Sequence, residues 1–95
     1  MLRITRKSNG KVVFKVSGQL TSGNVTEMEA LIAAEGKGKR IVLDCTDLRS
    51  VDGEAVKFLG KWEADSIKLK NCSLYIRERI RRERLERRSG ETSET

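Results

Sequence analysis

The chain has no histidine, no proline, only two cysteines, and aromatic residues at just 4% of its length. The absence of histidine removes the commonest general base, metal ligand and pH-sensitive side chain. The glycine-containing run 36–39 lacks the spacing of a phosphate-binding loop and is interpreted as a turn between a helix and a strand. We therefore expect neither an enzyme nor a bound cofactor.

Long apolar runs are also missing, since none approaches the roughly 18 residues that cross a bilayer. Residues 1–6 alternate in polarity and do not form the apolar block of a secretory signal. A cytoplasmic location without membrane association is the expectation. Cys45 and Cys72 lack the spacing of a familiar metal site, and although they could pair, both are interpreted as small buried side chains at strand ends.

The chain is rich in charged residues, which make up 36% of its 95 residues, and 37% of the residues are hydrophobic. A chain of this size forms a single domain with one two-layer core. Alternating apolar residues at 2–7 and 11–17 flank Asn9-Gly10, a dipeptide that accepts positive φ and favours an antiparallel hairpin.

A first helix is expected after the loop at 21–24, with Asn24 and Glu27 in capping-box spacing and Gly36 as its left-handed end. The later elements alternate in type and are a strand at 40–44, a helix at 54–65, a strand at 67–72 and a helix from Leu74, capped by Ser73. The order β-β-α-β-α-β-α predicts an α/β fold, with a mixed sheet and helices packed on one side.

The domain is expected to occupy residues 1–76. Residues 77–88 hold seven arginines and three glutamates, which predicts a charged helical extension beyond the core. Residues 89–95 contain no apolar side chain and are expected to be disordered.

Residues 41–59 are the most informative segment, because a buried strand, an acidic loop and an amphipathic helix follow one another there. Such a loop, at the carboxyl end of a strand, is where open α/β folds place binding sites. Its carboxylates, Asp44, Asp47, Asp52 and Glu54, could serve as acid/base pairs or as ligands of Mg²⁺ or Ca²⁺. In the alternative interpretation, Asp44 and Asp47 cap and turn the backbone.

The same segment resembles the STAS domain, the module of anti-sigma-factor antagonists and sulfate-transporter tails. That family has a hairpin ending near Gly-x-Leu, here 18–20, and later a strand of the form Ile-Val-Leu-Asp-Leu-Ser-x-Val-x-x-Ile-Asp-Ser-Ser-Gly-Leu. This chain matches the latter pattern without gaps at Ile41, Val42, Leu43, Asp44, Thr46, Leu48, Val51 and Asp52. The resemblance covers roughly residues 2–76 and implies a non-enzymatic protein-interaction module in bacterial signalling or transcription regulation.

Position 54 departs from the family pattern. In switching members the second hydroxyl residue after the aspartate accepts phosphate from a partner kinase, and here that phospho-acceptor-equivalent position is Glu54, in the run Asp52-Gly53-Glu54-Ala55. Glutamate cannot be phosphorylated. It either adds charge to the first helical turn or imitates phosphoserine in part, as a permanent negative charge.

The resemblance implies that a protein partner, such as an anti-sigma factor or signalling kinase, docks on this loop and the adjoining helix. The residues mapped to that surface are Ser22, Asn24, Asp52, Gly53, Glu54, Ala55 and Lys57. A homodimer through the last helix or an exposed sheet edge is also open. The alternative function is binding of nucleic acid or another acidic surface by the arginine-rich helix, but interleaved glutamates make a solvated helix the favoured interpretation.

Overall fold

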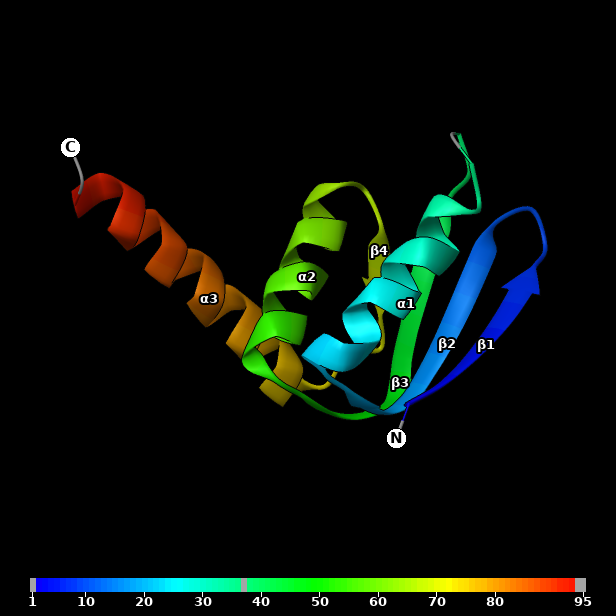
Figure 1. Cartoon of the computed structure of the whole chain (residues 1–95), viewed down its shortest axis with the longest axis horizontal. Helices are drawn as coiled ribbons and strands as arrows, with labels where there is room; N and C mark the ends of the chain where they lie inside the picture. The colour runs from blue at the N-terminus through cyan, green and yellow to red at the C-terminus, as the bar shows by residue number, and fades with distance from the viewer. Residues whose placement is uncertain (1, 37, 94–95) are drawn as a thin grey trace.

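The computed structural model of the protein describes residues 2–36 and 38–93, with side chains described as far as Glu86. Its elements follow the expected order (Figure 1) and are β1 (Leu2–Ser8), β2 (Val12–Leu20), α1 (Ser22–Ala33), β3 (Ile41–Val51), α2 (Gly53–Ala64), β4 (Lys68–Lys70) and α3 (Leu74–Ser93). The α/β class and the element order predicted from the sequence are therefore confirmed.

The four strands form one mixed sheet in the order β1-β2-β3-β4. Strands β1 and β2 are antiparallel, whereas β3 runs parallel to both β2 and β4. The hairpin between β1 and β2 turns at Gly10, whose φ of 75° lies in the left-handed region that glycine adopts at no steric cost. The predicted hairpin and the mixed character of the sheet are thus both present.

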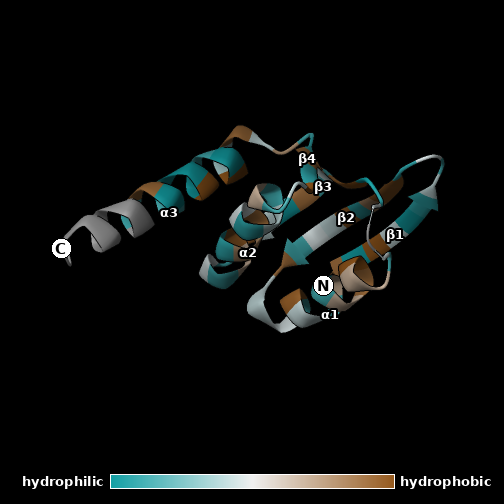
Figure 2. Cartoon of the chain, turned by 90° about the horizontal axis from the view of Figure 1, so that it is seen from above, coloured by the Kyte–Doolittle hydropathy of each residue, from teal (hydrophilic) through white to brown (hydrophobic). Residues whose placement is uncertain are grey.

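One face of the sheet is covered by α1 and α2, and α3 lies beside α2 beyond the β4 edge (Figure 1). The strand period of two directs Val12, Phe14 and Val16 of β2 into the layer beneath these helices, where each is at most 2% exposed. Trp62 on α2 belongs to the same core. Helix α3 is mostly hydrophilic, with short hydrophobic stretches (Figure 2), so only part of it can join this core.

Strand β3 is longer than the sequence indicated, because it runs to Val51 and not only to residue 44. Cys45, Leu48 and Val51 are all buried although they are spaced by three residues. Two register shifts against β2 account for this, since each bulge changes which side chains turn inward. The expected acidic loop is therefore largely strand.

The beginning of α1 also differs from the prediction. Thr21 occupies the N-cap position, and the side-chain oxygen of Asn24 accepts hydrogen bonds from the Thr21 hydroxyl at 2.9 Å and from its backbone N–H at 3.4 Å. Asn24 is thus the last residue of the capping box, at helix position N3, and not its first. The helix begins three residues earlier than the spacing of Asn24 and Glu27 indicated.

Helix α3 shows no boundary at residue 77 and runs unbroken to Ser93. Its inner face is held by Ile76 and Ile80, which are 0% and 4% exposed. Residues 89–93, expected to be disordered, are helical, and residues 94–95 lie outside the described residues. Packing of α3 against the core therefore extends past residue 76, to Ile80.

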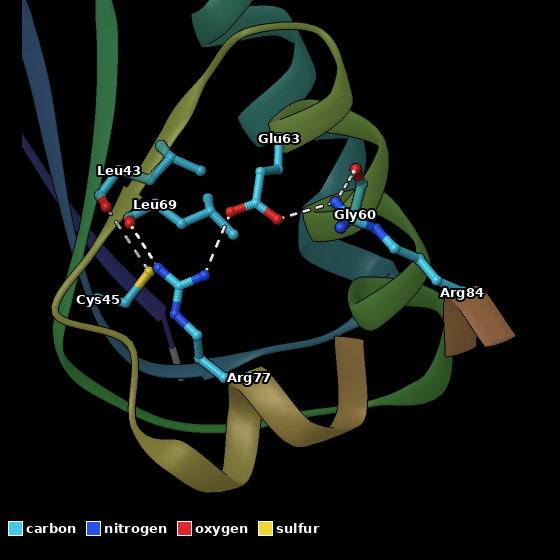
Figure 3. Close-up of polar contacts among 7 residues, drawn as sticks. All are labelled: Leu43, Cys45, Gly60, Glu63, Leu69, Arg77 and Arg84. Atoms are coloured by element: carbon cyan, nitrogen blue, oxygen red, sulfur yellow. Dashed lines mark hydrogen bonds and ion pairs between the residues drawn. The ribbon is translucent and has the colours of Figure 1, made fainter. Parts of the chain in front are cut away.

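Arginine side chains complete the attachment of α3 where apolar residues run out (Figure 3). Arg77 donates to the carbonyl oxygen of Leu69 at 2.9 Å and pairs with Glu63 at 3.2 Å. Arg84 pairs with the other carboxylate oxygen of Glu63 at 2.8 Å and lies across Gly60. A Cβ added at Gly60 would lie 3.9 Å from Arg84 Nε and 3.7 Å from Ile80, so the arginine packs there at ordinary contact distance.

Helix α2 ends with a strained residue, which gives a stability prediction. Ser66 has a φ of 74°, in the left-handed position where a glycine usually ends a helix, and Ile67 N–H donates to Trp62 C=O at 3.0 Å in a Schellman arrangement. We expect Ser66→Gly to raise the free energy of unfolding by about 0.5–1 kcal/mol, because the left-handed strain exceeds the entropic cost of glycine. Urea denaturation measures this difference.

The matched control for that prediction is Ala64→Gly, two residues earlier and exposed within the helical last turn of α2. There glycine should lower the free energy of unfolding by about 0.5–1 kcal/mol. If both glycine variants lose stability, the left-handed conformation of Ser66 carries no strain.

Candidate interaction site at the helix amino termini

The amino termini of α1 and α2 lie side by side, where β2 and β3 end. The last residues of those strands, Leu20 and Val51, are register partners. Asp52 N–H then donates to Leu20 C=O at 3.2 Å, which continues the pairing by one residue. Two helix amino termini consequently open side by side at the edge where open α/β folds bind their ligands.

Asp52 joins these two helices through its carboxylate. One oxygen accepts from Ala55 N–H at 2.9 Å, as the N-cap of α2, and the other accepts from Ser22 N–H at 2.8 Å, at the start of α1. These backbone donors hold the pKa of Asp52 below its usual range, and nearby Arg79 adds to that effect. Asp52 is therefore a bridging cap within the site.

Exposed residues surround this cap. Ser22, Gly53, Glu54 and Lys57 are all exposed, and the Glu54 carboxylate pairs with the Lys57 amine at 3.5 Å. A side chain added at Gly53 would meet no atom within 4 Å. This rim can reach a partner without any movement of the core.

Two residues of the expected partner-binding set have side chains that are less exposed to solvent. Ala55 is 0% exposed and its side chain packs in the core, away from the exposed surface. Asn24 is half-buried and its side-chain oxygen is already occupied by Thr21. Both residues form the support of the surface.

Helix α3 contributes a cation and an aromatic ring that the sequence analysis did not assign to the site. The Arg79 guanidinium donates to the carbonyl oxygen of Val51, directly before Asp52, and lies 5.9 Å from the ring centroid of Tyr75. Tyr75 is 60% exposed. Their i,i+4 spacing places both on one helix face, a signal that was hidden when residues 77–88 were interpreted as an extension.

Asp44 and Asp47 lie outside the site, on the face of the sheet away from α1 and α2. Asp44 accepts from Thr46 N–H and hydroxyl at 3.0 and 2.5 Å, which lowers its pKa, and Asp47 pairs with Lys15 at 3.4 Å. The strand does not stop at Asp44, and Asp47 does not lie in a loop, because both residues are within β3. Across the described residues, no three histidine, cysteine, aspartate or glutamate side chains gather as metal ligands would.

The two cysteines are free and meet between β3 and the start of α3. Cys45 is buried, as expected, but lies inside β3 and not at its end, while Cys72 is only partly buried. The neighbouring Cys72 thiol, followed by burial, raises the pKa of Cys45, whose Sγ donates to the carbonyl oxygen of Leu43 at 3.8 Å. Cys45 in turn lowers the pKa of Cys72, and Arg77 adds to that effect.

The mixed sheet and its paired helix amino termini define an open α/β domain with its exposed polar rim at the carboxyl ends of the strands. Residues 4–80 match the family model described as "Mlab, STAS domain". The chain belongs to the STAS domain family.

The fold has a solved counterpart. A crystal structure of an uncharacterised protein of the DUF3478 family, with a SpoIIAA-like fold, from Shewanella loihica PV-4 superimposes with a TM-score of 0.52 and 20% identity. The match covers 72% of this chain and 64% of that one, so this chain spans less than two thirds of its neighbour's length. No curated protein matches the sequence. No helix in the described part of the chain has the length and apolar character needed to cross a membrane.

Proposed function

We propose that the chain is a non-enzymatic interaction module of bacterial signalling or transcription regulation, resembling an anti-sigma-factor antagonist and acting in the cytoplasm. Its partner is a protein of the anti-sigma-factor or signalling-kinase type. The binding surface consists of Ser22, Gly53, Glu54 and Lys57, around the cap formed by Asp52. Membership of the STAS family and the shared fold support a protein-binding role.

The observation that carries this proposal is that Asp52 and Glu54 have different roles at the start of α2. Asp52 makes the capping hydrogen bond to Ala55 N–H, so α2 does not need Glu54 for its start. The Glu54 carboxylate is exposed and, among the described residues, forms its one ion pair with exposed Lys57. Because both members of this pair are exposed, the Glu54 carboxylate stays accessible to a partner.

That charge stands where switching relatives carry a phosphorylated hydroxyl residue. The helix dipole of α2 favours an anion at this position by about 0.3–1 kcal/mol. A phosphate group carries about −1.5 to −2 charges and can be removed, whereas the glutamate charge is single and permanent. We infer that this module binds without being switched by a kinase at residue 54.

Reversal of the charge at Glu54 tests the proposal. The partner is isolated from the source bacterium by cross-linking and mass spectrometry, and its affinity is then measured by calorimetry. We expect Glu54→Lys to weaken binding by about tenfold or more. The lysine would place a positive charge against the part of the partner that binds the Glu54 carboxylate, and like charges at an interface reduce affinity. Wild-type protein should take up no phosphate at residue 54 from a co-purified kinase.

Glu27→Lys is the matched control, since Glu27 is exposed on α1 and its reversal changes the net charge equally. It should bind as tightly as the wild type. Equal affinity of the wild type and Glu54→Lys would move the interface away from the helix amino termini.

The alternative of nucleic-acid binding by α3 finds less support in the geometry. Arg77 and Arg84 are paired with Glu63, and Arg79 donates to the backbone of Val51. These three cations serve to attach α3 to the domain. A homodimer stays a prediction.

A further inference from the structure

The face of the sheet turned away from α1 and α2, called here the open face, has no helical layer. Its side chains belong to three cross-strand rows, given by the register, and are Lys7, Val13, Val42 and Lys68; Thr5, Lys15, Asp44 and Lys70; and Arg3, Ser17 and Asp47. Sheets with parallel strands normally carry helices on both faces. Three of the four strands here are parallel, so an uncovered face is an exception.

The charges of the open face are arranged in two lines. Arg3 and Lys7 lie on edge strand β1, and Lys68 and Lys70 lie on edge strand β4. All four are exposed, and none of them forms an ion pair among the residues that the structure describes. Three strand spacings separate the lines, which is about 14 Å.

Between these two cationic lines lies a partly apolar strip. Val13 is half-buried, and Val42, though it points to the open face, is 5% exposed. Lys15 pairs with Asp47 within the strip, whereas Asp44 accepts hydrogen bonds from Thr46 and keeps its negative charge. An apolar centre between charged margins is the usual anatomy of a protein interface.

We propose that the open face is a second docking surface, separate from the helix amino termini, and that it binds an amphipathic acidic helix of a partner protein. A helix with its side chains is about 10–12 Å wide, which fits between lines about 14 Å apart. Its apolar stripe lies on Val13, and acidic residues on both flanks meet Lys7 and Lys68. Such a helix supplies the layer that the parallel strands lack.

Other occupants fit less well. Single-stranded nucleic acid stacks its bases on aromatic rings, and the open face carries none. The Asp44 carboxylate would repel phosphates along the middle of the face, whereas the proposed helix places its acidic side chains only at the flanks. An anionic membrane would meet no large apolar group to insert. Helix α3 of a second copy is rich in arginine, so the cationic lines would repel it.

The test uses a fluorescent peptide of about 14 residues, roughly 21 Å long as a helix, with leucine on one stripe and glutamate on both flanks. Anisotropy with the full chain should show saturable binding that weakens with salt. Lys68→Glu combined with Lys70→Glu should weaken it about tenfold or more, through like-charge repulsion. NMR spectra of the wild type should place the largest methyl shifts at Val13 and Val42.

The control pair Lys39→Glu and Lys61→Glu makes the same change of net charge at exposed residues off the open face and should leave affinity within about twofold. Thermal unfolding of each variant verifies the fold. Equal loss in both pairs, or no loss in either, overturns the proposal. If the chain binds duplex DNA or phosphatidylglycerol vesicles more tightly than the peptide, and this binding depends on Lys68 and Lys70, the assignment to an acidic helix is overturned.

Discussion

Replacement of Ile76 by alanine is expected to lower the free energy of unfolding by about 3–4 kcal/mol. Ile76 is 0% exposed and lies in the first turn of α3, where that helix meets the core. The remaining attachments of α3 are Ile80 and arginine side chains that pair at the surface, and exposed ion pairs contribute little. Urea denaturation followed by Trp62 fluorescence measures the change.

Leu74→Ala is the control for Ile76→Ala. Leu74 lies in the same turn of α3 but is 88% exposed, so its truncation should change stability by less than about 0.5 kcal/mol. If Ile76→Ala were equally mild, α3 would not be part of the cooperative domain, and residues 1–76 would fold with little help from it.

Replacement of Asp52 by alanine is expected to cost about 2 kcal/mol, because one carboxylate serves two helices. The change removes the N-cap acceptor of Ala55 N–H, which is worth about 1–2 kcal/mol, and leaves Ser22 N–H without its partner. Asp52→Asn retains an acceptor oxygen and should lose less. Thermal unfolding of the three proteins at neutral pH gives the order of stability.

The same carboxylate makes stability depend on pH. Since the pKa of Asp52 in the folded protein lies below its unfolded value of about 3.9, its contribution is complete above that value and is lost as pH falls through the folded pKa. Wild type and Asp52→Asn should therefore converge in stability at acid pH. A difference that stays constant down to about pH 2 would show that charge on Asp52 is not involved.

Much of the fold follows from local chemistry that the sequence displays openly. Asn9-Gly10 marks the hairpin, Gly36 adopts the left-handed conformation after α1, and the Ser73 hydroxyl accepts from Ile76 N–H at 3.2 Å as the cap of α3. The length of β3 was hidden, because bulges let residues spaced by three point inward. The attachment of α3 beyond residue 76 was hidden as well, because Arg84 lies opposite Gly60, at a place that apolar periodicity assigns to a hydrophobic residue.

In the candidate site, too, some features could be predicted from the sequence and others could not. The strand–loop–helix pattern around Asp52 was visible in the sequence, and the structure brings Ser22 to within 2.8 Å of that carboxylate. Arg79 and Tyr75 could not be placed there, since their position depends on the direction in which α3 leaves β4. A helix direction is set by packing among distant elements and not by local spacing.

The short edge strand β4 affects whether the sheets of two molecules can join edge to edge. Strand β4 has three residues, Lys68-Leu69-Lys70, and at the opposite edge β1 carries Arg3, Arg6 and Lys7. Two molecules that extended one sheet by joining these edges would bring ammonium and guanidinium groups together. Short, cationic borders of this kind oppose strand addition and the growth of fibrils. An uncovered sheet face therefore need not lead to edge-to-edge polymerisation of this domain.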